Sequence, residues 1–416
     1  MDDAGIQWSK LETGMTGLPG LPRLSPESTW LVAALRARYH PERVGALSDQ
    51  PDLDWGLVME TARKNAVVQL IVPVIRELPP SAVPDAVREG SAREAREIAA
   101  SNLELTGELM RILDLLESEG ISALPYKGPV LAQVAYGNLG MRRFADLDIL
   151  VDRADVQRTV GVLAADGYRS DAKLSPRQVD ALLDHGHDWH LDKRGRYLVE
   201  VQWAVANHEH MLPRGVQPLM SRASSVRLVG RDVPTLDPTD QIVVLAMHGG
   251  IHLFTRLAWV CDMVEAISNV PGADADAAFR IADHGHARRM LLFAVAMADR
   301  ILDVRPAPEL AARARADGKL GKVIDDLMPA VLAPGGPDHR SPHVRVGTRI
   351  ALADRRTDAI RGMWRAIVTP TPADYAAVRL PDAVWPAYHL VRLGRLAHFY
   401  LFGRRGTDEI EAFDHL

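Results

Sequence analysis

Apolar residues recur at helical spacing over the first part of the chain. Residues 1–27 are rich in Gly and Pro and are expected to form a flexible arm. Ser28 is expected to cap the first helix, and apolar residues then repeat at intervals of three and four from 53 to 77. This pattern predicts a helical region over 28–119.

The end of that region is marked by a long amphipathic helix. It is expected to run from about 84 to 118 and to stop at Gly120, the residue type that most often ends a helix in the left-handed conformation. The periodicity then changes to short alternating segments. They read as strand, helix, strand, helix and strand in the order ISALPY, GPVLAQVAYG, DLDILV, RADVQRTVGVLAADG and YLVEVQW, which ends at 203.

These segments predict an α+β fold, with a small mixed β-sheet core over 120–236 flanked by helical regions. A second helical domain is expected over 237–332, beginning at the capping sequence DPTD. The stretch APGGPDHRSPH predicts a loop or linker over 333–344, and a C-terminal helical segment is expected over 345–416.

Composition excludes several classes of protein. Apolar residues make up 47% of the 416 residues, charged residues 25%, and the formal net charge is only −5, so no strong polyanion-binding character is expected. Cys261 is the only cysteine, which excludes an intramolecular disulfide and a zinc site built on several thiolates. The N-terminus is acidic, and the longest apolar run, Met290 to Ala298, is far too short to span a bilayer. We therefore expect a cytoplasmic protein with no membrane contact.

The candidate chemistry starts from two acids in the segment MRRFADLDILV. Asp146 and Asp148 lie two residues apart at the head of a predicted strand, so both carboxylates are expected on one face of the sheet. Such a pair suits Mg²⁺, which prefers oxygen ligands and shares its coordination sphere with phosphates.

Two neighbouring segments strengthen this interpretation. Lys127 and Gly128 stand between a predicted strand and a predicted helix, where backbone N–H groups and the helix dipole favour phosphate. In the strand YLVEVQW, alternation places Glu200 and Gln202 on one face, and a carboxylate on such a strand needs a partner.

Together the segments PYKGPVLAQVAYG, MRRFADLDILV and LVEVQW resemble a group of bacterial nucleotidyltransferases in the DNA polymerase β-like superfamily, whose pattern is Lys-Gly, Tyr, Arg, Asp-x-Asp and Glu-x-x-Trp. The expected helix MHGGIHLFTRLAWVCD, over 247–262, adds His248, His252, Arg256 and Trp259 at helical spacing. One departure is Pro129, because most members of the wider superfamily have Ser after the Gly.

The resemblance implies nucleotidyl transfer from a nucleoside triphosphate, expected to be ATP, to a hydroxyl or phosphate of a small molecule, a peptide or an RNA. It implies that Asp146, Asp148 and Glu200 hold two Mg²⁺ ions, with Mn²⁺ as an alternative, and that Glu200 completes the second site or acts as general base. The nucleotide-binding residues that it implies are Lys127, Gly128, Arg142, Arg143, His248 and His252.

Other interpretations of the same residues stay open at this stage. Lys127 could be an ordinary surface lysine, Glu200 could pair with Arg194 or Arg196, and His248 and His252 could pack against Trp259. The histidines of DHGHDWH and NHEH, over 185–210, match no standard zinc spacing. Asp188 or His187 could instead line the cleft if their strand pairs with 197–203.

Two rival functions are also compatible with the sequence. Pro129 would suit a nucleotide-binding regulatory module with reduced turnover. The arginines between 344 and 404 would suit a toxin-like enzyme that modifies tRNA. The sequence specifies neither the acceptor nor the oligomeric state.

Overall fold

The computed structural model describes residues 18, 20–48, 53–170, 173–205, 215–334 and 342–402. Most of the predicted arm 1–27, most of the predicted loop 333–344, and His208 and His210 lie outside these ranges.

The N-terminal region is helical, as predicted, but it differs from the prediction in two details. Helix α1, Pro26–Tyr39, is capped by Ser25, whose hydroxyl accepts from the backbone N–H of Ser28 at 3.2 Å. The prediction that Ser28 is the cap is wrong, because Pro26 already occupies the first turn. The apolar repeat over 53–77 forms two helices, α2, Trp55–Lys64, and α3, Val68–Glu77. They are separated at Ala66, whose φ is 55°.

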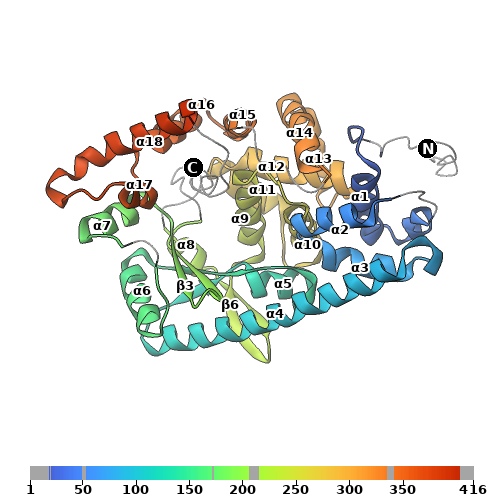
Figure 1. Ribbon diagram of the computed structural model, residues 1–416, viewed down its shortest axis with the longest axis horizontal. Helices are drawn as coiled ribbons and strands as arrows, with labels where there is room; N and C mark the ends of the chain where they lie inside the picture. The colour runs from blue at the N-terminus through green and yellow to red at the C-terminus, as the bar shows by residue number, and fades with distance from the viewer. Residues whose placement is uncertain are drawn as a thin grey trace.

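Helix α4, Asp85–Ser118, confirms the prediction of one long helix. Its end is set by Gly120, with φ 68°, and by the bond from the Ile121 N–H to the Leu116 carbonyl at 2.9 Å. Figure 1 shows α4 running along one side of the molecule, from the N-terminal helices to α6, Val156–Ala165.

A four-stranded sheet lies on α4 in the order β1-β2-β4-β3. The strands are β1 Ala123–Pro125, β2 Asp146–Val151, β3 Asp188–Lys193 and β4 Tyr197–Gln202. Strands β2 and β4 are parallel, and the two outer pairs are antiparallel, so the sheet is small and mixed as predicted. The sequence indicates a strand at Asp188 only as an alternative, and it does not predict the separate hairpin of β5, Ser224–Leu228, and β6, Arg231–Thr235.

The two faces of the sheet differ in character. Leu147 and Ile149 of β2 and Val199 and Val201 of β4 are fully buried in a core that includes Leu109 of α4. Because side chains alternate along a strand, the acids of β2 and β4 point to the opposite face. Packing against α4 therefore fixes which face carries the polar residues.

Helices cover the remainder of the chain. Three short helices accompany the sheet, namely α5 Gly128–Tyr136, α7 Pro176–His185 and α8 Gln217–Met220. The region after the sheet contains α9 Pro238–Ile251, α10 Leu257–Asn269, α11 Ala275–His284, α12 Arg288–Met297, α13 Pro308–Ala316 and α14 Gly318–Val331. Asp237 caps α9 with bonds from Thr239 and Asp240, as the sequence predicts.

The predicted single helix over 247–262 is wrong. Helix α9 ends at Ile251 and α10 begins at Leu257, with Leu253 and Phe254 at positive φ between them. The turn brings the Phe254 ring onto Gly249, where a Cβ atom would lie 2.2 Å from the ring, and against Phe293 at 5.6 Å between centroids. Close packing on a residue without a side chain therefore ends the helix.

The C-terminal segment connects two distant parts of the molecule. It contains α15 Pro342–Leu352, α16 Arg356–Val368, α17 Pro372–Ala377 and α18 Tyr388–Phe402. Helix α15 packs on α14, whereas the far end meets α7, where Gln178 donates to the Tyr388 hydroxyl at 3.2 Å. Figure 1 shows this segment above the sheet, with α17 next to α7. Among the described helices, none is both long enough and apolar enough to cross a bilayer.

Candidate active site

Polar residues form a compact group on the face of the sheet that points away from α4. Asp148 lies opposite Glu200 across the parallel pair β2 and β4, and Glu200 lies opposite His190 across the antiparallel pair β4 and β3. Asp146 is two residues before Asp148, and Asp188 is two residues before His190. The sheet register therefore brings the three predicted acids together on one face and adds Asp188 and His190.

Lys127 and Gly128 lie beside these acids, at the start of α5. The Lys127 ammonium lies 2.5 Å from Asp148 Oδ1, and their side chains are 10% and 1% exposed. Lys127 is therefore a buried ion-pair partner, and the interpretation as a surface lysine is wrong.

Gly128 is required by its backbone geometry. Its φ of 51° is strained for other residues, and a Cβ atom there would meet the Asp146 carbonyl oxygen at 3.4 Å. The helix start therefore approaches β2 closely, and this places the N-terminal end of α5 next to the acids.

Gln202 and Tyr126 hold the acids in place. The Gln202 amide donates to Asp148 Oδ1 at 3.0 Å and to Glu200 Oε2 at 2.8 Å, while its oxygen accepts from the Tyr126 hydroxyl at 2.5 Å. One buried amide thus fixes the two carboxylates relative to each other. Tyr126 and Gln202 were not predicted as site residues, although Gln202 shares the polar alternation of Glu200.

The site carries excess negative charge. Burial and repulsion from Asp148 raise the pKa of Asp146, and burial with the nearby charge of Glu200 raises the pKa of Asp148 to about 6, although Lys127 acts in the opposite sense. Burial alone would lower the pKa of Lys127, but the surrounding carboxylates outweigh it and hold that pKa well above its ordinary value. A divalent cation would relieve this repulsion.

The donor set fits a divalent ion. Asp146, Asp148 and Glu200 supply carboxylate oxygens on one face, the hard ligands that Mg²⁺ takes. Burial and repulsion among these acids raise the pKa values of Asp146 and Asp148, and the repulsion favours cation binding.

The third strand lines the same cleft. His190 Nε2 lies 2.9 Å from Asp188 Oδ2 and 3.6 Å from Glu200 Oε1. Burial would lower the pKa of His190, but these two carboxylates outweigh it and raise the pKa to about 9. The strand pairing on which the alternative for Asp188 depended is observed, and it places Asp188 on the face of the sheet that carries the acids. Of the histidines of DHGHDWH, His190 belongs to the acid cluster, whereas His187 contacts Asp188 at 3.5 Å.

Glu200 does not pair with Arg196 as the alternative interpretation proposed. Arg196 and Tyr197 both bond to Glu104 of α4. Further along the hairpin, Arg111 of α4 and Lys193 of β3 converge on Asp166, with contacts of 2.5 and 2.8 Å.

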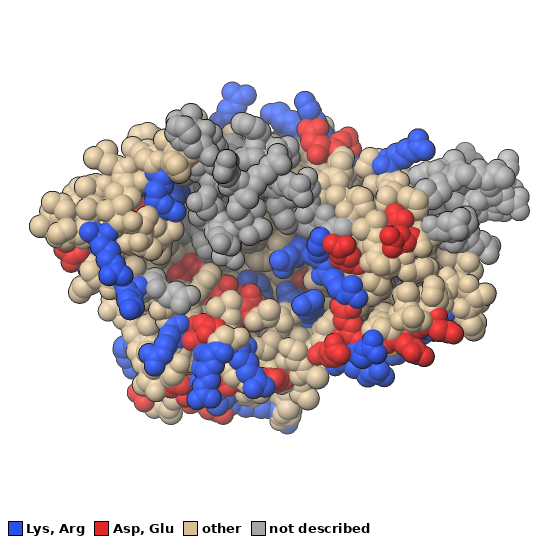
Figure 2. Space-filling view, viewed as in Figure 1, with Lys and Arg blue, Asp and Glu red and all other residues tan. Residues whose placement is uncertain are grey.

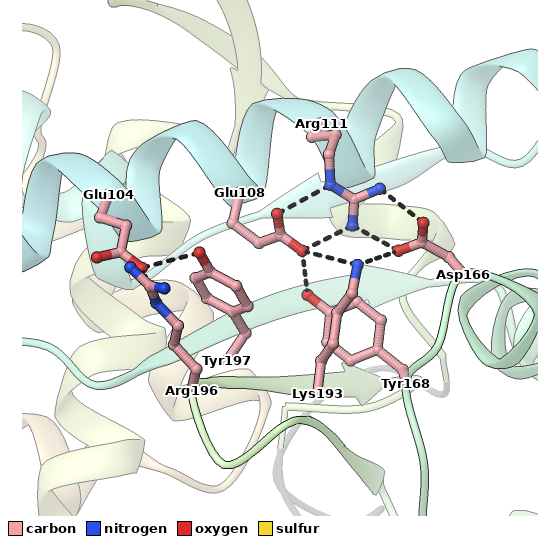
Figure 3. Close-up of polar contacts among 8 residues, drawn as sticks. All are labelled: Glu104, Glu108, Arg111, Asp166, Tyr168, Lys193, Arg196 and Tyr197. Atoms are coloured by element: carbon pink, nitrogen blue, oxygen red, sulfur yellow. Dashed lines mark hydrogen bonds and ion pairs between the residues drawn. The ribbon is translucent and has the colours of Figure 1, made fainter.

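Figure 3 shows that this network lies between α4 and the β3-β4 hairpin. The Tyr168 hydroxyl completes it by donating to Glu108 at 2.7 Å. The network anchors the hairpin that carries Glu200 and His190, and it lies on the α4 side of the sheet.

Arg142 occupies a buried ion pair. Its guanidinium donates to both carboxylate oxygens of Asp262 in α10, at 3.0 and 3.1 Å, and Asp262 also accepts from the Tyr136 hydroxyl at 2.8 Å. Asn102 of α4 donates to the Arg142 carbonyl at 2.7 Å. Arg142 thus joins α4, α5 and α10 immediately before β2. The sequence carried no signal for Asp262 as its partner.

Arg143 points elsewhere, into a groove of about 640 Å³ along α4. The groove is lined by Arg63, Gly90, Arg93, Glu94, Glu97, Ile98, Ser101, Asn102, Glu104, Leu105, Arg143, Phe144, Ala145 and Arg196. Its lining reaches Ala145, the residue directly before Asp146.

His248 and His252 form an aromatic cluster with Trp259. The ring centroids lie 4.7 Å apart for the two histidines, and 5.3 and 5.2 Å from Trp259 for His248 and His252. Packing of both histidines against Trp259 is therefore confirmed. Burial, followed by the positive charge of Lys127, holds the pKa of His248 well below its ordinary value, so its ring is neutral.

The cleft is visible on the surface. Figure 2 shows a hollow at the centre of this face, with acidic and basic side chains in its floor, where α5, α9 and α10 converge in Figure 1. Mixed charge in a hollow suits an anionic ligand that carries divalent cations.

The comparison with known families gives a match. The model of a family described as uncharacterised nucleotidyltransferase matches residues 51–303. Among solved structures, the chain is similar to an antigenic nucleotidyltransferase-like protein from Paracoccidioides brasiliensis. The identity is 15%, with 51% of this chain and 93% of that chain covered at a TM-score of 0.30. No curated protein matches the chain.

Proposed function

Because the chain belongs to this family of nucleotidyltransferases, we propose that it transfers a nucleoside monophosphate from a nucleoside triphosphate, preferentially ATP, to a hydroxyl or phosphate acceptor, with two bound Mg²⁺ ions. The observation that carries the proposal is the convergence of Asp146, Asp148 and Glu200 beside the start of α5. Two divalent ions would activate the attacking oxygen and neutralise charge on the phosphates.

The acids divide into two roles. Asp146 and Asp148, two residues apart on β2, would hold one ion against the phosphates, and Glu200 would complete the second site from β4. Gln202 keeps Asp148 and Glu200 in register through its two amide bonds. Because these carboxylates are already in place before the substrate binds, transfer requires less reorganisation of the site.

We assign phosphate binding to the start of α5. Gly128 allows the backbone to approach closely, and the N–H groups of a helix start favour an anion. The Lys127 ammonium pairs with Asp148, and it would be able to contact a phosphate oxygen if Asp148 held a metal ion. Lys127 would then supply a positive charge in this turn, where Pro129 stands in place of the Ser whose hydroxyl would contact phosphate.

The neutral ring of His248 suits a hydrogen bond to the nucleotide near the same cations. Arg142 supports the cleft through Asp262, so its role is to position the β2 start. Arg143 faces the groove along α4, which we assign to the acceptor.

The groove suits an acceptor of mixed charge. Arg63 pairs with Glu94 and Arg196 with Glu104 within it, and among the described residues Arg93, Arg143 and Glu97 make no ion pair there. A polyanion such as tRNA would meet three carboxylates as well as four arginines along this path, which is less favourable than a purely basic surface. A small molecule or peptide with both signs of charge fits better.

Labelled nucleotide tests the proposal. The protein is incubated with each α-³²P-labelled NTP, Mg²⁺ and a cell extract, in wild-type form and as Asp146→Asn/Asp148→Asn. We expect transfer of label by the wild type and its loss in the variant. A matched double change outside the cluster, Asp155→Asn/Asp184→Asn, should retain transfer.

Nucleotide binding without transfer for any NTP would contradict the proposal and favour the regulatory module. Transfer to tRNA alone would favour the toxin-like function.

A further inference from the structure

Strand β3 adds two metal-ligating side chains to the acid cluster, and neither belongs to the Asp-x-Asp pair. One ligand atom each from Asp188, His190 and Glu200 lies within 4.8 Å of the others. His190 Nε2 stands between the two carboxylates, 2.9 Å from Asp188 Oδ2 and 3.6 Å from Glu200 Oε1.

These separations match what a metal ion requires. Ligand atoms bind a small divalent ion at roughly 2.1 Å, so neighbouring ligands of a six-coordinate ion lie about 3 Å apart. The two distances from His190 Nε2 need only small side-chain adjustments to reach that value. An imidazole nitrogen with two carboxylates on one side of an ion leaves the other positions for water and substrate oxygens.

The carboxylates are already oriented by other residues. Gln202 donates to Glu200 Oε2 at 2.8 Å, so Glu200 Oε1 is the oxygen nearer to His190. His187 Nδ1 lies 3.5 Å from Asp188 Oδ1, while Oδ2 faces His190. Such second partners are the usual means by which proteins orient metal ligands.

We propose that Asp188, His190 and Glu200 form a mixed nitrogen-oxygen site for a divalent transition-metal ion, with Mn²⁺ as the probe. Asp146 and Asp148 offer oxygen only and suit Mg²⁺, whereas an imidazole ligand favours a transition metal. Glu200 would then be a ligand shared between this site and the Mg²⁺ site of the proposed function. The role of this ion in transfer rests on the proposed function, but its binding does not.

Metal binding requires a neutral imidazole, so any proton on the ligating nitrogen of His190 must leave when the ion binds. A purely structural histidine, cross-linking β3 and β4 by hydrogen bonds, is the competing explanation. It requires no metal, and the experiment below separates the two.

Pulsed EPR on Mn²⁺ gives a direct readout. The full-length protein, free of any polyhistidine tag, is titrated with Mn²⁺ at pH 7.5, and the spectra are examined for ¹⁴N coupling from a bound imidazole. We expect ¹⁴N coupling in the wild type. We expect its loss in His190→Gln, together with a fall in Mn²⁺ affinity of at least about 10-fold, the lower bound seen even for residues outside the coordination shell.

His185→Gln, on the exposed end of α7, is the matched control and should keep the coupling. Uniform ¹⁵N-histidine labelling of the wild type should convert the coupling to ¹⁵N, a test that needs no variant. Absence of nitrogen coupling in the wild type, or its persistence in folded His190→Gln, would overturn the site.

The outcome is independent of transfer. Nitrogen coupling without any nucleotidyl transfer by the wild type would support the metal site and contradict the proposed function. Nucleotidyl transfer without nitrogen coupling would support the proposed function and contradict the metal site.

Discussion

Asp148 lies directly opposite Glu200 in the parallel pair of β2 and β4, and the amide of Gln202 bonds to both carboxylates. These acids are 52 residues apart in sequence, and the register of a four-stranded sheet joins them. A shift of one residue in this register would turn Glu200 into the apolar core against α4.

Glu200→Gln tests the contribution of that carboxylate. The change keeps the size of the side chain but removes its charge, so we expect transfer to fall by about 10²- to 10⁴-fold, the range for losing a residue that acts on protons in the reaction. Steady-state transfer rates with saturating NTP provide the measurement. Glu119→Gln, at the exposed end of α4, should leave the rate unchanged. An unaltered rate in Glu200→Gln would exclude a catalytic role for Glu200.

Lys127→Met tests the buried ion pair. Loss of the cation leaves three carboxylates facing one another, so the free energy of unfolding should fall by about 3 kcal/mol without metal, near the range for breaking a buried pair. Mg²⁺ should recover much of this loss, because it supplies the missing positive charge. Urea unfolding with and without Mg²⁺ measures both effects.

Lys64→Met is the control, because Lys64 makes an exposed pair with Glu60 on α2. It should change the free energy of unfolding by less than about 0.5 kcal/mol. A similar small effect for Lys127→Met would show that the ion pair with Asp148 contributes little.

Gly249→Ala tests the packing that ends α9. A methyl group there would meet the Phe254 ring at 2.2 Å, so we expect destabilisation of about 1–3 kcal/mol from overpacking. Gly107→Ala, in the middle of α4, has open space and should stabilise by up to about 1 kcal/mol. Thermal unfolding compares the two, and equal effects would contradict this explanation of the helix break.

The network of ion pairs between α4 and the β3-β4 hairpin predicts that the free energy of unfolding depends on pH. Hydrogen bonds from Arg111 hold the pKa of Glu108 below its ordinary value. Burial alone would raise the pKa of Asp166, but donation by Arg111 and Lys193 outweighs it and lowers that pKa too. Lowered carboxylate pKa values stabilise the fold above the unfolded values near 4, and this stability is lost as pH falls through the folded values.

Arg111→Met removes the donor. It should reduce the free energy of unfolding by about 1 kcal/mol at pH 7, a modest amount because Arg111 is partly exposed. The difference from wild type should shrink at pH 3.5, because this pH lies below the unfolded pKa values and the stability that the lowered folded pKa values supply is then being lost. Urea unfolding at pH 7, 5 and 3.5 measures it, and a difference that stays constant with pH would contradict the coupling.

The parts of the site that follow local rules could be predicted from sequence. Alternation along β2 predicted that Asp146 and Asp148 share one face, and Gly120 predicted the end of α4. Alternation along β4 likewise placed Glu200 and Gln202 together. These features depend only on the period of the element that carries them.

The remaining parts depend on tertiary contacts. The pairing of Arg142 with Asp262 joins residues 120 positions apart and has no local signal. Strand β3 alternates Trp189 and Leu191 with Asp188, His190 and Asp192, which is a strand pattern, but the register that places His190 opposite Glu200 is fixed only when the hairpin forms. The break between α9 and α10 follows from the packing of Phe254 on Gly249, which becomes visible only when both helices are in place.

The position of the label in the product tests the central claim most directly. The wild-type protein is incubated with Mg²⁺, cell extract and ATP labelled either at the α- or at the γ-phosphate. Nucleotidyl transfer predicts that α-label appears on the acceptor while γ-label leaves as pyrophosphate, and that both signals vanish in Asp146→Asn/Asp148→Asn. Transfer of γ-label to the acceptor, or α-label transfer that survives in the double variant, would contradict the account.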